Sequence, residues 1–242
     1  MEHRLSKPYM VNMALSSEGS LTWLNTIACG VSALGVVPPL GEIQEAVDRH
    51  RDLFVHHILR QLGYPHLYGI LRDRCGVGSR GCEIGVYVGD NAVRLIHFVE
   101  PSSLHLVDPY VNHGIEGDAW TGPHVAQEEV EGRMKIMLDR IERTPSSCVV
   151  NFHRMTSAEY FAQADPDSLD WIYIDGNHNE QFVVDDINGA LECVRVGGII
   201  SGDDHTNATW KPHIEAAWKR IDPTKYKVIY DETEPWIWER VS

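Results

Sequence analysis

Strand-like and helix-like segments alternate along the chain from Gly81 to its end, and this alternation limits the fold most strongly. Short runs rich in β-branched residues predict strands at Cys82–Val88, Leu104–Asp108, Cys148–Phe152, Leu169–Asp175, Gly198–Asp203, Lys227–Tyr230 and Trp236–Trp238. Helical segments fit between them at Asp90–Val99, Val125–Arg143, Ser157–Gln163, Asn179–Val194 and Ala208–Arg220. Strands separated by helices favour a mostly parallel sheet that is covered on both faces.

The last two predicted strands are connected differently. Only Asp231–Pro235 separates them, which is too short for a crossover helix, so they should form an antiparallel hairpin at the sheet edge. The predicted fold is therefore α/β, with a doubly wound, seven-stranded and mostly parallel sheet that ends in an antiparallel C-terminal hairpin strand.

Residues 1–75 stand outside this pattern and are predicted to form an N-terminal helical segment, while residues 76–242 form the main domain. Helical spacing predicts a helix at Glu42–Leu62. The apolar stretch before it should be covered, either by completing a substrate pocket or by contacting a second subunit, which favours a homo-oligomer. The irregular stretch Pro109–Val125 is long enough to be a lid, in which Trp120 either covers a substrate or packs on the surface.

The charge balance excludes several classes of partner. Lys and Arg number 21 against 35 Asp and Glu, which gives a net charge of −14. Such a surface repels nucleic acids and anionic lipids, so a small-molecule partner is expected. The most apolar stretch, Ile27–Leu40, is too short to span a membrane and begins too late for a secretory signal, so a cytoplasmic location is expected. Five cysteines without a C-x-x-C pair argue against disulfides and structural zinc.

A glycine turn follows the first predicted strand, with Glu83, Gly85 and Gly89 in the order E-x-G-x-x-x-G. Glycines let the backbone approach a ligand closely, and the helix that opens at Asp90 directs free amides toward it. Glu83 favours a cationic or zwitterionic ligand over a pyrophosphate. Asp108, which ends the second strand, can accept hydrogen bonds from ribose hydroxyls. The alternative is a plain strand-to-helix turn whose glycines serve packing alone.

Acidic residues also end two later strands. Asp175 follows the fourth strand with His178 three residues beyond it, and Asp203 and Asp204 follow the fifth. Neighbouring strands lie about 4.8 Å apart, so three carboxylates would repel one another without a compensating charge. A hard divalent cation with oxygen ligands, such as Mg²⁺, would relieve this repulsion. The alternative is that Asp203 or Asp204 only caps the following helix.

The glycine turn and the acid after the second strand resemble those of class I S-adenosylmethionine-dependent methyltransferases, over roughly Gly81–Ser242. The resemblance implies the Rossmann-like methyltransferase fold and a donor-binding catalytic domain at residues 76–242. It places the methionine part of the donor near Glu83 and Tyr87, the ribose at Asp108 and the adenine near the turn that ends at Ser157. The predicted donor-binding residues are Glu83, Gly85, Tyr87, Gly89, Asn91, Asp108, Ser157 and Asp175.

The acids of the later strands resemble those of metal-dependent O-methyltransferases of small molecules. Asp175, Asp203 and Asp204 match the metal positions, and the double aspartate is closer to the enzymes that methylate macrolide sugars. His178 stands where the catechol-type enzymes have a lysine base. The resemblance implies Mg²⁺-dependent methyl transfer from S-adenosylmethionine to a hydroxyl of a sugar, polyol or catechol-like molecule. His178 would accept the proton, with Asp175 as the other candidate for this catalytic role.

Two other functions remain open from the sequence. A nicotinamide-dependent oxidoreductase would favour G-x-G-x-x-G and would not need the acids at Asp175, Asp203 and Asp204. A noncatalytic protein that binds adenosylmethionine or a metal would not need a positioned base such as His178. Nitrogen or nucleic-acid acceptors are disfavoured by the negative charge and by the lack of an N-P-P-Y-like motif.

Overall fold

The computed structural model describes residues 67–112, 122–230 and 235–242. They belong to a compact unit that extends from Pro65 to Ser242. The predicted helix Glu42–Leu62, the apolar stretch before it and the lid residue Trp120 lie outside the described residues. No helix in the described ranges is both long and apolar enough to cross a membrane.

A single seven-stranded sheet, in the order β3-β2-β1-β4-β5-β7-β6, organises the described part of the chain. Its strands are β1 Arg80–Ile84, β2 Ser103–Val107, β3 Val149–His153, β4 Leu169–Ile174, β5 Val194–Gly202, β6 Tyr226–Tyr230 and β7 Trp236–Arg240. The first five strands pair in parallel, whereas β7 pairs antiparallel with both β5 and β6. The predicted α/β fold with an antiparallel C-terminal hairpin is therefore confirmed.

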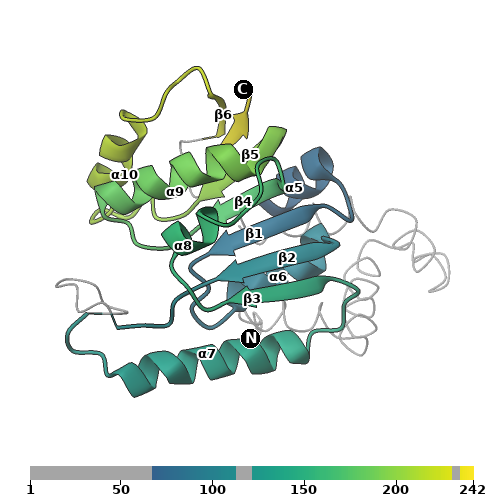
Figure 1. Cartoon of the computed structure of the whole chain (residues 1–242), viewed down its shortest axis with the longest axis vertical. Helices are drawn as coiled ribbons and strands as arrows, with labels where there is room; N and C mark the ends of the chain where they lie inside the picture. Colours follow the sequence, from purple (N-terminus) through teal and green to yellow (C-terminus); the bar gives the residue numbers. More distant parts are fainter. Residues whose placement is uncertain (1–66, 113–121, 231–234) are drawn as a thin grey trace, which may run out of the picture. The chain divides into compact units, whose positions relative to one another are not determined.

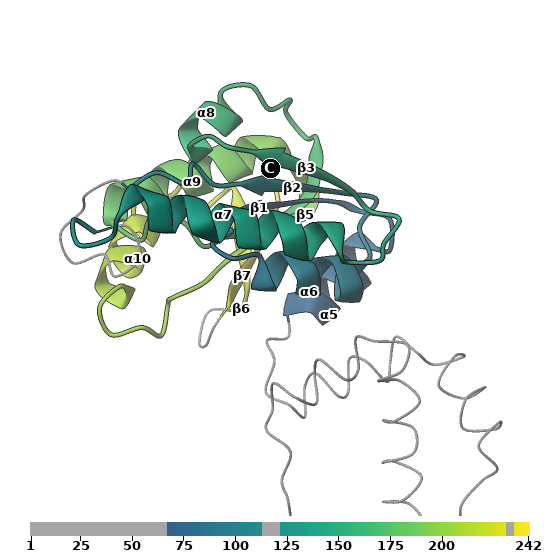
Figure 2. The same ribbon diagram turned by 90° about the horizontal axis from the view of Figure 1, so that it is seen from below.

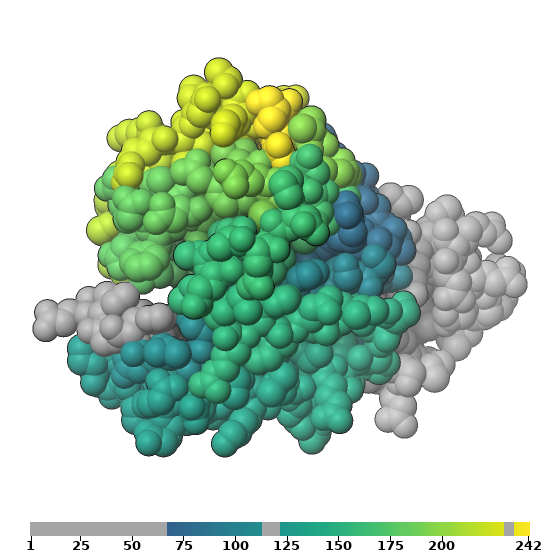
Figure 3. Space-filling model, in the orientation of Figure 1, coloured from purple at the N-terminus to yellow at the C-terminus, as the bar shows by residue number. Residues whose placement is uncertain are grey.

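Helices cover both faces of the sheet (Figures 1 and 2). They are α5 Leu67–Cys75, α6 Asp90–Val99, α7 Gln127–Glu142, α8 Ser157–Phe161, α9 Glu180–Cys193 and α10 Lys211–Trp218. In Figure 2, α8 and α9 lie on one side of the strands, and α5 and α6 lie on the other. The space-filling view shows a continuous surface where the light-green residues of α9 meet the darker-green residues around α8 (Figure 3).

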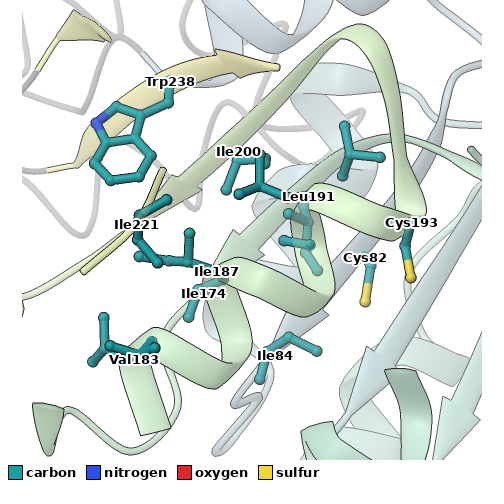
Figure 4. Close-up of a cluster of buried hydrophobic side chains, with 14 of the residues drawn as sticks. Cys82, Ile84, Ile174, Val183, Ile187, Leu191, Cys193, Ile200, Ile221 and Trp238 are labelled. Atoms are coloured by element: carbon teal, nitrogen blue, oxygen red, sulfur yellow. The ribbon is translucent and has the colours of Figure 1, made fainter. Parts of the chain in front are cut away.

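The largest core cluster forms where α9 packs on the sheet. Val183, Ile187 and Leu191 recur at helical spacing, so they share one face of α9, and all three are buried. They meet aliphatic side chains from β1, β4 and β5 (Figure 4). Each fully buried aliphatic side chain of this size contributes about 1.5–3 kcal/mol relative to an exposed one. This packing fixes the ends of β1, β4 and β5 relative to one another.

Several element boundaries differ from the sequence prediction. Strand β1 ends at Ile84 and does not extend to Val88, because Gly85 adopts a φ of 81° and turns the chain away from the sheet. Helix α10 begins at Lys211 and not at Ala208, with Pro212 in its first turn, where proline is well tolerated. Helix α5 was not identified as a separate element, although residues 1–75 were predicted to be helical in general. Its Leu67 and Leu71 are buried, and it belongs to the unit that holds the sheet although the sequence grouped it with residues 1–75.

Candidate functional site

Most of the predicted site residues lie at or beyond the carboxyl ends of four adjacent strands, β2, β1, β4 and β5, whereas Ser157 follows β3. The order of the strands reverses between β1 and β4, since β2 and β3 follow on one side and β4 and β5 on the other. Ligands of doubly wound sheets bind at such a reversal. The topology therefore brings the glycine turn and the acids of the later strands to one edge.

Gly85 joins the turn after β1 to the end of β4. A Cβ atom at this position would lie 2.0 Å from the carbonyl oxygen of Asp175, and the φ of 81° is one that side chains rarely tolerate. Gly89, at the start of α6, has a φ of 78° and lies against Met137, whose Cγ would be 2.9 Å from an added Cβ. Both glycines are therefore required by close approach within the protein, whatever the ligand.

Asp108 holds the same turn from the side of β2. Its Oδ2 accepts hydrogen bonds from the backbone N–H groups of Val86 at 2.9 Å and Tyr87 at 3.1 Å, and its Oδ1 accepts one from Tyr110 at 2.8 Å. The carboxylate thus fixes a backbone that includes the strained Tyr87, with a φ of 52°. A carboxylate has about four acceptor sites, so a role at a ribose is compatible with these bonds and stays a prediction.

Glu83 is buried behind the turn, with 1% of its surface exposed. Its Oε1 accepts a hydrogen bond from Nδ2 of Asn91 at 2.9 Å, and Oδ1 of Asn91 accepts one from the Tyr68 hydroxyl at 2.7 Å. Its Oε2 has no hydrogen-bond partner among the described residues. Burial raises the pKa of Glu83 well above its ordinary value, although the bond from Asn91 opposes this effect. An unpaired buried carboxylate oxygen is costly, so it suits a ligand that brings a cationic N–H donor.

Tyr68 completes this network and was not identified from the sequence. It lies in α5, a short helix with no distinctive pattern, and only 2% of its surface is exposed. Nothing in its local sequence signals that its hydroxyl reaches Asn91, 23 residues away.

Two further predicted donor-binding residues are Tyr87, in the turn after β1, and Ser157, which follows β3. Tyr87 is 42% exposed, and its ring centre is 5.1 Å from the guanidinium carbon of Arg133. Ser157 opens α8 after a capping box in Thr156 and Glu159. The Ser157 hydroxyl hydrogen-bonds to the buried carboxyl group of Asp186 on α9. Burial raises the pKa of Asp186 to about 7, and the bond from Ser157 opposes this rise.

His178 bridges two of the predicted acids. Its Nε2 lies 2.9 Å from Oδ2 of Asp204 and 3.5 Å from Oδ1 of Asp175. Ligand atoms of these three residues all lie within 4.8 Å of one another, a spacing that could hold a metal ion. Asp203 lies outside this group, because it accepts a hydrogen bond from the hydroxyl of Tyr173. The structure thus brings together two of the three predicted metal ligands and the predicted base.

The charges in this group are strongly coupled. Burial raises the pKa of Asp175 to about 6 against the opposing bond from His178, although 36% of its side chain is accessible. Burial would lower the pKa of His178, but its bonds to the two carboxylates outweigh this effect and raise it to about 9. The bond from His178 holds the pKa of Asp204 below its ordinary value. Without another cation, the imidazolium of His178 is the charge that holds the carboxylates together.

Comparison with known proteins identifies the family of the chain and relates its fold to solved structures. The profile of a family described as a methyltransferase domain matches residues 82–205, more than half of the 242 residues. Protein R132 of Acanthamoeba polyphaga mimivirus, which is uncharacterized, is 33% identical over 73 residues, 26% of this chain and 33% of that protein. The matched segment therefore spans about a third of this curated relative.

Solved structures resemble this chain at low sequence identity. A candidate methyltransferase from Streptococcus mutans, in complex with SAH, is 12% identical with a TM-score of 0.50, over 72% of this chain and 96% of that chain. The N-methyltransferase NodS from Bradyrhizobium japonicum, in complex with S-adenosyl-L-homocysteine, is 11% identical with a TM-score of 0.47, over 73% and 85%. At such identities the likeness concerns the fold alone.

Proposed function

The chain belongs to the methyltransferase-domain family, and we propose that it moves a methyl group from S-adenosylmethionine to a hydroxyl of a small molecule. In this proposal a divalent cation binds at the acidic residues that follow β4 and β5. The observation that supports this proposal is that two features lie at the same edge of the sheet. A buried carboxylate with an unpaired oxygen, suited to a cationic ligand, lies at the end of β1, and a cluster with metal-ligand spacing lies at the ends of the neighbouring β4 and β5.

In this proposal, the donor lies along the turn after β1. Oε2 of Glu83 would accept a hydrogen bond from the ammonium group of its methionine part, which relieves the unpaired oxygen. Gly85 keeps the turn close to β4, and Asp108 fixes the amides of Val86 and Tyr87 while it receives the ribose hydroxyls. Ser157 would border the adenine.

The acceptor would lie over Asp175, His178 and Asp204. A divalent cation held there would supply Lewis-acid activation of an acceptor hydroxyl. The surrounding carboxylates disfavour acceptors with phosphate or carboxylate groups, since like charges would meet at short distance. Neutral diols such as sugars, polyols and catechols suit the site better. One member of the group would take the proton, and alignment of the two reactants can supply about 7–11 kcal/mol of the barrier reduction.

The other functions considered from the sequence fit less well. The family match and the absence of G-x-G-x-x-G in the turn after β1 do not favour a nicotinamide-dependent oxidoreductase. A noncatalytic binding protein would bind the donor without transferring its methyl group, which the following assay tests directly.

The test is turnover of S-adenosylmethionine with vicinal-diol acceptors, with and without a divalent cation and a chelator. We expect methylated diol to form, the chelator to suppress it, and Asp204→Ala to abolish the metal stimulation. The exposed Asp165→Ala is the matched control and should leave turnover unchanged. Equal turnover with and without the chelator, transfer only to amines or RNA, or failure to bind the donor would contradict the proposal.

A further inference from the structure

We infer that the cation of this site is held by an imidazole nitrogen together with two carboxylates, from His178, Asp175 and Asp204, and that it is a first-row transition ion in preference to Mg²⁺. This inference rests on the proposed function. It replaces Asp203 by His178 in the ligand set that the sequence predicts.

The distances within the group suit a shared ion. Two donor atoms that each lie about 2.1 Å from an ion, at an angle of about 90°, are about 3.0 Å apart. Nε2 of His178 is 2.9 Å from Oδ2 of Asp204 and 3.5 Å from Oδ1 of Asp175, which corresponds to angles of about 90–110°. The carboxylate oxygens of Asp175 and Asp204 lie within 4.8 Å of each other, whereas two donors of one ion can be at most about 4.2 Å apart, so a shared ion is reached by rotation of these side chains toward it.

The backbone separates Asp203 from this group. Strand β5 ends at Gly202, so the side-chain directions of Asp203 and Asp204 are set by the turn that follows it. The backbone N–H of Asp203 still bonds to the carbonyl of Ile174 in β4, at 3.1 Å, and its side chain lies with Tyr173. Asp204 adopts a φ of 59°, and this left-handed conformation in the turn after β5 brings its carboxylate to His178.

The neighbours of the group hold two of its ligands in place. The Asn207 side chain donates to Oδ1 of Asp204 at 3.3 Å, and the Asn207 backbone N–H bonds to the Asp204 carbonyl at 3.1 Å. The His178 ring lies 5.8 Å from that of Trp210, and 13% of its side chain is accessible. Such surroundings orient metal ligands and strengthen metal binding.

The chemistry of the donor set selects the ion. Mg²⁺ prefers oxygen ligands and retained waters, whereas imidazole favours ions from Fe²⁺ to Zn²⁺. One imidazole and two carboxylates leave positions for an acceptor. Since a nitrogen that holds the ion cannot also accept a proton, His178 would not be the base in this arrangement.

The test is calorimetric titration of the full chain with Co²⁺ and with Mg²⁺, together with the visible absorption of the Co²⁺ complex. We expect Co²⁺ to bind at least 100-fold more tightly than Mg²⁺. His178→Ala should weaken Co²⁺ binding at least tenfold, change Mg²⁺ binding less than threefold, and alter the Co²⁺ spectrum. The exposed His213→Ala, on α10 next to Trp210, is the matched control and should behave as the unaltered protein.

Asp203→Asn separates the two ligand sets, because it should leave the Co²⁺ affinity and spectrum unchanged. The inference is overturned if Mg²⁺ binds as tightly as Co²⁺, if neither ion binds, if Asp203→Asn abolishes binding, or if His178→Ala keeps the affinity and spectrum of the parent. Circular dichroism and S-adenosylhomocysteine binding are measured on every variant. Failure of the unaltered protein to bind S-adenosylhomocysteine would refute the proposed function, whereas the metal titrations alone decide the ligand set.

Discussion

Asp186→Asn tests how a buried acid near the site affects the stability of the fold. Asp186 lies on the core side of α9 with 3% of its surface exposed, and burial raises its pKa to about 7, against an opposing bond from Ser157. In the unfolded chain the same group has the ordinary value of 3.8. Between these two values the unfolded chain has lost the proton and the folded protein retains it, so the free energy of unfolding falls as the pH rises.

The size of the effect follows from the two values. A tenfold change in proton affinity corresponds to about 1.4 kcal/mol, so a difference between 3.8 and about 7 gives a loss of about 4 kcal/mol between pH 4 and pH 8, as an upper limit. Asparagine has the same shape and can accept the bond from Ser157, but it does not ionise. We therefore expect Asp186→Asn to be about 2–4 kcal/mol more stable than the parent at pH 8 and within about 1 kcal/mol at pH 4.

The assay is urea unfolding between pH 4 and pH 8, followed by tryptophan fluorescence. Trp171, Trp236 and Trp238 are at most 1% exposed, so their emission should report loss of the core. Glu192→Gln, at an exposed position of the same helix, is the control and should follow the parent at every pH. Parallel pH dependences for Asp186→Asn and the parent, or a less stable Asp186→Asn at pH 8, would refute the reasoning.

Two further substitutions test the turn after β1. Gly85→Ala should lower the melting temperature and abolish S-adenosylhomocysteine binding, because its Cβ would lie 2.0 Å from the Asp175 carbonyl oxygen and the left-handed backbone would cost about 1–2 kcal/mol more. Thermal melting and calorimetry measure the two effects, and a stable variant that still binds would contradict the close approach. Tyr68→Phe should weaken S-adenosylhomocysteine binding about tenfold, since Asn91 loses the hydrogen bond that orients it toward Glu83. The affinity for methylthioadenosine, which lacks the amino-acid part, should not change. Equal losses of affinity for both ligands would indicate a merely structural role.

The order and type of most elements could be predicted because their signals are local. Helix α9 repeats Val183, Ile187 and Leu191 at helical spacing, and the short connection before Trp236 required an antiparallel pair. The end of β1 was mispredicted because the residues after Gly85 also resemble a strand. Their amides bond to Asp108, which is more than 20 residues away, and this competition between strand and turn is not visible locally.

The donor side of the candidate site could be predicted only in part for a similar reason. Glu83 and Asn91 are close in sequence to the glycine turn, so a pattern of nearby residues marks them. Tyr68 joins the same network through one hydroxyl group, from a helix that no local sequence pattern indicates. A contact made by a single polar atom from a distant segment produces no hydrophobic periodicity and no motif spacing from which it could be predicted.

The acids after β5 show a different limit of prediction from sequence. Two adjacent aspartates after a strand lead to the prediction that both lie beside Asp175, because the path of the chain after the strand cannot be derived from local spacing. Strand β5 ends at Gly202, and both aspartates follow it. The side chain of Asp203 accepts a hydrogen bond from Tyr173, while Asp204 takes a left-handed conformation and lies beside His178. The backbone conformation after the end of the strand therefore decides which carboxylate joins Asp175 and His178, and the number of carboxylates in the sequence does not indicate it.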